Sequence, residues 1–274
     1  MRFFKLLLMG SICMLVCHSC STCSRKQPAD IIIDLADWAI DSTYANMARK
    51  AYYALPTPIE MSMLLKSSGI GWQPDLLSNP ADAAKHLTHR KMALNFGVYV
   101  TDLTYAGLFE QSQTVLRYKR AIEILTDGMG LQSAVDFNTL QQLEANANDK
   151  DAVLRIVAET YASCTASLNE SDRYSLTLAM LTGGWIEGMY IATSMTTLYD
   201  SRTKQLIIDQ KLTFDMMWMV MSDLNHIPDV AGMMNDLSEL AQLLDKVDVD
   251  NVTLEEYVKI KEQIRILRQN IINL

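Results

Sequence analysis

Two isolated carboxylates are the residues of this sequence best suited to chemistry. Asp102 is the one charged residue in positions 92–109, and Glu187 is the one charged residue in positions 175–198. A carboxylate on an apolar helix must be paired, hydrogen-bonded or neutral. Two such acids in one accessible site would provide a general acid and base, or two ligands for a cation. The competing interpretation is a pair of buried acids satisfied by Tyr, Arg or backbone groups.

Aromatic residues accompany both acids and are candidate ligand-binding residues. Tyr105 follows Asp102 by one helical turn, while Trp185 and Tyr190 lie within three residues of Glu187. Residues three or four apart share a helix face. We therefore take Asp102 and Glu187 as candidate catalytic residues, and Tyr105, Trp185 and Tyr190 as candidate ligand contacts.

Asp82, His86 and His89 have a spacing that places them on one face if the segment is a single helix. That arrangement is a candidate metal site. Basic residues at positions 85, 90 and 91 surround it and disfavour a cation. The favoured interpretation is a solvated polar face, and we expect no metal and no cofactor.

Methionines are concentrated in residues 216–221 and recur at Met233 and Met234. Thioethers bind Cu(I), but they also fill irregular gaps in a core or line adaptable apolar grooves. Because this segment is apolar on several faces, core filling is the favoured interpretation.

The composition excludes several classes of function. The net charge is −8 and the chain has no basic excess that could neutralise nucleic-acid phosphates. Neither a phosphate-binding loop, a dinucleotide fingerprint, a serine nucleophile elbow nor a zinc-protease motif is present. We therefore expect no nucleic-acid partner, and an enzyme becomes the less favoured class.

The first residues have the pattern of a targeting signal. Arg2 and Lys5 precede an apolar run over residues 6–16, which is too short to span a bilayer. Ser19 directly before Cys20 resembles a bacterial lipobox, which predicts a signal peptide over residues 1–19 and a lipid on Cys20. Residues 20–29 would then be the lipidated cysteine and a flexible tether. An ordinary secretory signal and an uncleaved anchor are the alternatives, and Cys23 is a second candidate for the lipid.

This assignment changes the meaning of the five cysteines. Cys13 and Cys17 belong to the signal and Cys20 would carry the lipid, which leaves only Cys23 and Cys164. Two cysteines so placed do not form a disulfide framework. We expect Cys164 to be a small buried apolar residue.

The remaining chain is predicted to be all-α. Apolar residues recur at helical spacing, and no stretch shows sustained strand alternation. Pro, Gly and capping residues divide residues 30–274 into about nine helices in a single irregular bundle without a sheet. The predicted helices cover residues 30–55, 57–69, 80–109, 112–127, 136–147, 149–168, 169–199, 204–246 with a kink or break at Pro228, and 253–272.

The two nearly uncharged helices are expected to be central to this bundle. Residues 175–198 are long enough to span a membrane, but the central Glu187 opposes insertion. Gly184 and Gly188, one turn apart, predict a close approach of a neighbouring backbone.

Two motifs carry a resemblance to known proteins. Residues 53–61, YALPTPIEM, and residues 183–188, GGWIEG, resemble an uncharacterised family of all-helical lipoproteins from Gram-negative anaerobic bacteria. The resemblance implies a helical fold and a location in the cell envelope, and it carries no activity.

The sequence thus favours a lipid-anchored protein of the cell envelope, at the periplasmic or surface face of the outer membrane. Its expected role is non-enzymatic binding or scaffolding. The expected partners are the membrane, reached through the lipid, and either an envelope protein or a small apolar ligand. The alternative is an enzyme or cation-binding protein built on Asp102 and Glu187.

Overall fold

A computed structural model of the chain describes residues 65, 69, 71–135, 137–195 and 201–273, which fall in one compact unit, Asp41–Leu274. The signal, Cys20, Cys23 and the tether lie outside the described residues. So do the helix predicted over residues 30–55 and all but two residues of the helix predicted over 57–69.

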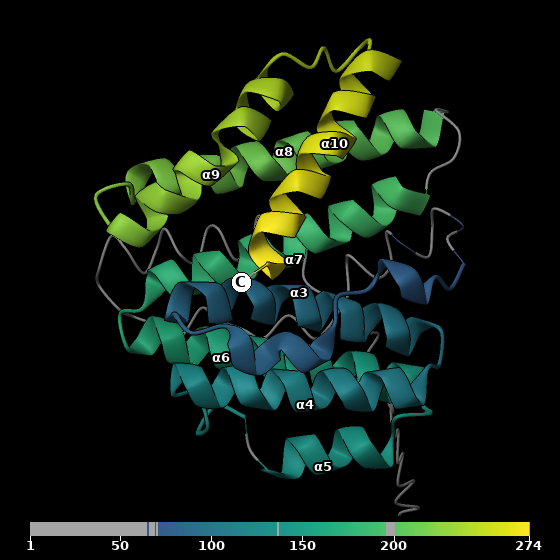
Figure 1. Ribbon diagram of the computed structural model, residues 1–274, viewed down its shortest axis with the longest axis vertical. Coiled ribbons are helices and arrows are strands. Elements are labelled where there is room, and N and C mark those ends of the chain that lie inside the picture. The colour runs from purple at the N-terminus through teal and green to yellow at the C-terminus, as the bar shows by residue number, and fades with distance from the viewer. Residues whose placement is uncertain (1–64, 66–68, 70, 136, 196–200, 274) are drawn as a thin grey trace, which may run out of the picture. The chain divides into compact units, whose positions relative to one another are not determined.

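The described residues form eight α-helices and two short 3₁₀ helices, with no strand among them (Figure 1). The prediction of an all-α, multi-helix fold is confirmed. The elements are η3 (Pro74–Leu76), η4 (Pro80–Lys85), α3 (His89–Leu108), α4 (Ser112–Met129), α5 (Phe137–Ala145), α6 (Lys150–Glu170), α7 (Tyr174–Met195), α8 (Ser201–Asp223), α9 (Pro228–Asp245) and α10 (Leu254–Ile272).

Local capping signals set several of the helix ends. Asp149 caps α6 by accepting a hydrogen bond from the backbone N–H of Ala152, and Thr253 caps α10 in a reciprocal capping box with Glu256. Gly130 ends α4 in the left-handed conformation that glycine adopts without strain. Pro228 begins α9, so the long helical pattern breaks there and does not merely kink.

The helix predicted over residues 80–109 is interrupted, which corrects the sequence interpretation. Residues Pro80–Lys85 form the 3₁₀ helix η4, and α3 begins only after Thr88. The Thr88 side chain accepts a hydrogen bond from the backbone N–H of Lys91, so the second start has its own cap. Two separate helices therefore begin in this segment, at Pro80 and at His89, where the sequence predicted a single one.

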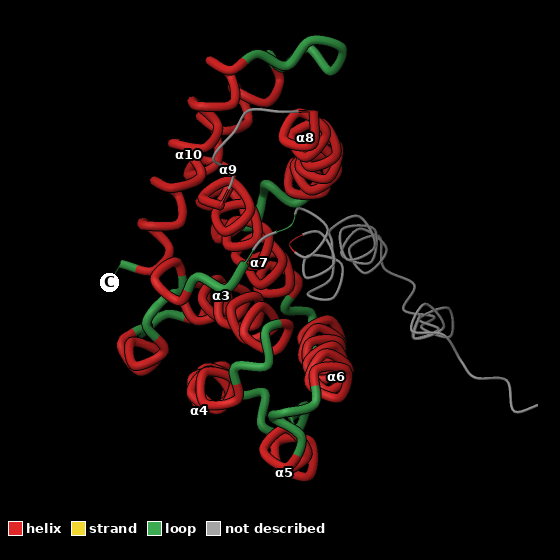
Figure 2. Tube along the Cα trace, turned by 90° about the vertical axis from the view of Figure 1, so that its right-hand side faces the viewer, coloured by secondary structure: helices red, strands yellow, loops and turns green. Residues whose placement is uncertain are grey.

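Helices α3 and α7 form the centre of the described unit. They contact each other more extensively than any other helix pair, with α4 and α6 on one side and α9 and α10 on the other (Figure 2). Most residues of both helices are buried. The expectation of two central, nearly uncharged helices is thus confirmed. None of the described helices is long and apolar enough to cross a membrane.

Glycines allow α3 and α7 to pack with their backbones in contact. A Cβ atom on Gly183 would lie 1.9 Å from the carbonyl oxygen of Leu94, and one on Gly97 would lie 2.0 Å from that of Met180. At Gly184, by contrast, the nearest atom would be Thr101 Oγ1 at 3.4 Å. The sequence predicted the close approach at Gly184, whereas the position at which a side chain is excluded is its neighbour Gly183.

We predict that Gly183→Ala destabilises the protein by about 1–3 kcal/mol, because the added methyl group pushes the backbones of α3 and α7 apart. Gly184→Ala is the matched control. It has room for the methyl group and removes a helical glycine, so its effect should lie within about 0.5–1 kcal/mol, toward higher stability. Urea unfolding followed by circular dichroism measures both. Equal effects of the two variants would contradict the packing described here.

Candidate functional site

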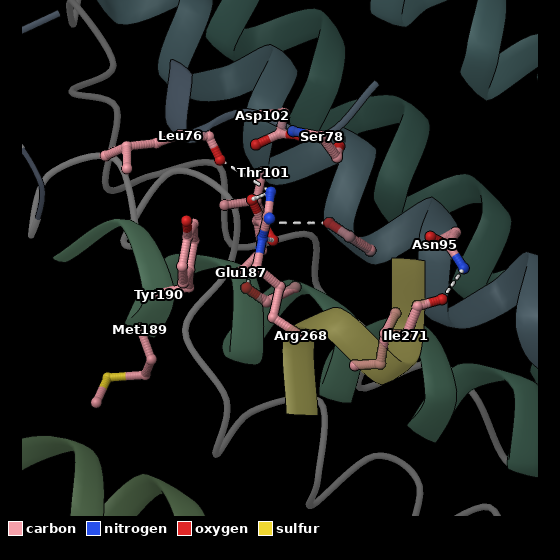
Figure 3. Close-up of polar contacts among 12 residues, drawn as sticks. Leu76, Ser78, Asn95, Thr101, Asp102, Glu187, Met189, Tyr190, Arg268 and Ile271 are labelled. Atoms are coloured by element: carbon pink, nitrogen blue, oxygen red, sulfur yellow. Dashed lines mark hydrogen bonds and ion pairs between the residues drawn. The ribbon is translucent and has the colours of Figure 1, made fainter. Parts of the chain in front are cut away.

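Asp102 and Glu187 do converge, and a third charged residue joins them. Arg268 of α10 makes a bidentate pair with Glu187, from Nε to Oε2 at 2.7 Å and from Nη2 to Oε1 at 2.9 Å (Figure 3). Both carboxyl groups are completely buried, and the Arg268 side chain is 8% exposed. A planar guanidinium facing a carboxylate in this way forms the strongest type of protein ion pair. The site is therefore already occupied by an internal cation.

Arg268 is held by further contacts on its other edges. Its Nη2 also donates to the carbonyl oxygen of Leu76 at 2.9 Å, and its guanidinium lies 4.1 Å from the centre of the Tyr190 ring. Burial lowers the pKa of Arg268, but the charge of Glu187 and its hydrogen bonds outweigh burial and raise the pKa overall. The guanidinium thus stays charged in the core.

Asp102 is held in its neutral form. Burial and the nearby charge of Glu187 raise its pKa well above the ordinary 3.8, and the hydrogen bond from Ser78 and the charge of Arg268 only partly oppose them. Oδ2 accepts hydrogen bonds from the backbone N–H of Ser78, at 3.0 Å, and from its hydroxyl group. Oδ1 is buried and has no hydrogen-bond partner among the described residues, and the proximity of Glu187 favours the neutral form of Asp102.

The chemistry of this cluster is that of a satisfied core network. One neutral acid, one ionised acid and one guanidinium have no net charge, so no counter-ion is required. General acid–base catalysis needs contact with a substrate, and both carboxyl groups are completely buried. Of the two interpretations left open by the sequence, this geometry favours the satisfied buried acids.

Tyr105 holds a loop and does not line an open ligand site. Its hydroxyl group donates to the carbonyl oxygen of Gly71 at 2.6 Å and accepts from the N–H of Gln73 at 3.0 Å. The ring of Trp72 stacks on it, with 5.2 Å between the ring centres. Trp72 also packs against Phe109, with 6.0 Å between the ring centres, so this loop lies against the side chains of Tyr105 and Phe109.

The other two aromatic candidates face other partners. Trp185 donates from Nε1 to Gln210 Oε1 at 2.9 Å and packs on Phe214, both on α8. Tyr190 lies beneath Arg268 (Figure 3). The contacts described for Tyr105, Trp185 and Tyr190 thus involve three separate sets of residues and define no common ligand site.

Asp82, His86 and His89 are not on one helix face, which corrects the geometry assumed for a metal site. Asp82 belongs to η4, His86 follows its last residue, and His89 begins α3. His86 is buried and His89 is exposed, so a shared solvated polar face is wrong for His86. Among the described residues, no three His, Cys, Asp or Glu side chains gather closely enough to hold a metal ion.

His86 instead joins a network that connects three segments. Its Nε2 lies 3.4 Å from the hydroxyl oxygen of Tyr99, which donates to the carbonyl oxygen of Asn79. Asn95 lies 3.4 Å from His86 Nδ1 and donates to the carbonyl oxygen of Ile271 at 2.9 Å (Figure 3). Burial lowers the pKa of His86, and the charge of nearby Lys91 lowers it further. The imidazole is therefore neutral at pH 7.

The sulfur-containing residues are mainly in the core. Met217, Met221 and Met233 are buried, in keeping with core filling, whereas Met219 is 56% exposed. Cys164 is buried, and burial raises the pKa of its thiol to about 12. A thiol that remains protonated is a poor nucleophile, so Cys164 is the inert apolar residue that its sequence context indicated.

Arg268 and Ser78 are the residues of the cluster that sequence reasoning missed. Arg268 follows Ile260 and Ile264 on the buried face of α10, a position where a charged residue signals an internal partner. Ser78 lies in a loop, and nothing in its neighbours indicates that it reaches Asp102.

Comparison with known proteins adds no name or activity: no family model, no curated protein and no solved structure matches the chain. The resemblance to helical lipoproteins stays a prediction, and the function has to be argued from this chain's own residues.

We predict opposite outcomes for the two amide substitutions of the buried acids. Glu187→Gln should cost about 3–5 kcal/mol, because it leaves Arg268 as a buried charge without a counter-ion. Asp102→Asn should instead raise the stability at pH 7 by more than about 1 kcal/mol, because the amide accepts the hydrogen bond from Ser78 and is neutral without the cost of protonating a carboxyl group whose ordinary pKa is 3.8.

The pH dependence gives this comparison a second measurement. An acid with a raised native pKa contributes stability below its unfolded value of 3.8, and that contribution is lost as the pH rises through the native value. Asp102→Asn should therefore gain stability relative to the parent chain as the pH rises. Urea unfolding at several pH values measures this. A large loss for Asp102→Asn at pH 7 would show that the native acid is ionised.

We predict that His86 makes the protein less stable in mild acid. Its native pKa lies below the unfolded value of 6.5, so the unfolded chain takes up the proton first as the pH falls. Stability should therefore decrease below pH 6.5 and level off below the native pKa. His86→Gln should abolish this component of the pH profile. The exposed His89→Gln is the control and should retain it; loss of the component in the control alone would contradict the assignment.

Proposed function

We propose that the chain is a lipid-anchored protein of the cell envelope, attached to the outer membrane through Cys20, whose helical domain is a non-enzymatic binding or scaffold module. The observation that carries the anchor is the N-terminal sequence. A basic start, an apolar run over residues 6–16 and a serine directly before Cys20 resemble a lipoprotein signal.

The arrangement of the core supports the binding or scaffold role. Its ionisable residues satisfy one another: Arg268 pairs with Glu187, and Asp102 is neutral and bonded to Ser78. Charged groups used in this way fix how helices are placed relative to one another and leave no reactive group facing solvent. Any recognition of a partner or ligand then depends on the surface of the helices.

The alternative of an enzyme or cation-binding protein rests on the meeting of Asp102 and Glu187. Their proximity favours it, but their complete burial and the guanidinium of Arg268 oppose it. A cation would have to displace an internal arginine that already makes two hydrogen bonds to Glu187.

The anchor is tested by labelling with radioactive palmitate in a Gram-negative host, followed by mass spectrometry of the mature N-terminus. We expect the parent chain and Cys23→Ala to be labelled, to sediment with membranes and to begin at a diacylated or triacylated Cys20. Cys20→Ala should lose the label. An unmodified N-terminus elsewhere, or a label that depends on Cys23, would overturn the assignment.

A further inference from the structure

A small cavity lies where the start of α3 meets α9 and α10. Its volume is about 250 Å³, and its apolar wall is formed by Leu94, Met233, Leu237, Leu267 and Ile271. At about 30 Å³ per molecule, liquid water would fill it with about eight molecules. That size suits a short alkyl chain or a single aromatic ring.

Two cations stand beside this apolar wall. Arg90 and Lys91 both line the cavity, and Asp236 is the one acid among its lining residues. Arg90 pairs with Asp236, which leaves Lys91 as the uncompensated charge. Lys91 is half-buried, and its ammonium group makes no ion pair with any described residue. In a chain with a net charge of −8, this site carries local positive charge.

Arg90 and Lys91 lie at the start of α3, where the helix dipole disfavours positive charge. The first turn of α3 contains His89, Arg90 and Lys91 and no acid, although the positive end of a helix dipole favours acids. Arg90 is also fitted tightly against α9, where a Cβ on Gly232 would lie 2.5 Å from its Nη1. Its Nε atom is buried and has no hydrogen-bond partner in the part of the chain that the structure describes. A bound anion would compensate the charge that α3 itself leaves uncompensated.

We propose that this cavity binds a small amphiphilic anion, with its apolar body against Leu237 and Ile271 and a carboxylate at Lys91. Charge complementarity selects the anionic head, and the cavity volume selects a short body. This inference rests on the binding half of the proposed function and names its ligand class. It is independent of the lipid on Cys20.

The test is photo-crosslinking of the full chain with a diazirine analogue of octanoate, followed by mass-spectrometric location of the label. We expect the label on α9 and α10 at the cavity, and competition by octanoate but not by octanol or octylammonium. Lys91→Gln should weaken labelling at least tenfold in apparent Kd, which equals about 1.4 kcal/mol. Lys91→Glu should abolish it.

Lys85→Gln is the matched control, because Lys85 is near in sequence but pairs with Asp82 and does not line the cavity. It should label like the parent chain. Circular dichroism verifies that each variant is folded. Label spread over the surface, equal competition by octanol, or unchanged labelling of Lys91→Gln would overturn the proposal.

A lipid headgroup offers similar anionic chemistry, and competition by vesicles separates it from a free ligand. Competition by phosphatidylglycerol vesicles without competition by octanoate would overturn a free short-chain ligand. Because labelling does not require acylation, a chain that is not lipidated at Cys20 but is labelled at the cavity would refute the anchor and retain the binding site.

Discussion

The structure depends on burying an arginine and two acids between its central helices. A charge taken out of water costs several kcal/mol unless a partner compensates it. Arg268 therefore has to meet Glu187, which fixes α10 against α7 at that point. Burial and the charge of Glu187 both raise the pKa of Asp102, so Asp102 retains its proton. Each of these groups is acceptable in the core only because of the other two.

Side chains of this cluster and its neighbours also hold residues 71–79, the segment that comes before α3 in the chain. Residues 71–79 have few backbone partners of their own, and α3 and α4 supply them from side chains. Tyr105 bonds the backbone at Gly71 and Gln73, Asp102 bonds Ser78, and Tyr118 donates to the carbonyl oxygen of Ser78. Arg268 adds the carbonyl oxygen of Leu76. Ser78 is the buried residue of this segment, and both of its backbone groups are bonded in this way, as buried backbone groups must be.

The sequence predicted the helices well because their ends carry local signals. Gly130, Asp149, Pro228 and Thr253 act within a few residues of themselves, so they can be recognised without a tertiary structure. The break before α3 was missed because its cap, Thr88, lacks the acidic residue three positions later that would have marked it. His86, which lies in that break, was consequently given the wrong surroundings.

The candidate site shows a different limit. Asp102 and Glu187 were recognisable because each is the one charge in a long apolar stretch. Their shared partner could not be recognised, since Arg268 lies 81 residues after Glu187 and contacts between distant helices leave no local pattern. Whether an isolated acid is reactive or merely satisfied depends on that partner. A single charged residue in a long apolar stretch can therefore indicate a buried polar site, but it does not show what that site does.

The two groups of charges in α3 show where function has to be sought. Asp102, in the second half of the helix, lies at a position where a charge would be buried, and the fold holds it neutral and bonded to Ser78. Lys91, in the first turn, lies where a helix dipole disfavours a cation, and no acid among the described residues pairs with it. An unfavourable charge that other residues of the protein compensate contributes to the fold. An uncompensated charge beside a cavity instead indicates a bound ligand. The start of α3, and not its buried acid, is thus the part of this helix open to a ligand.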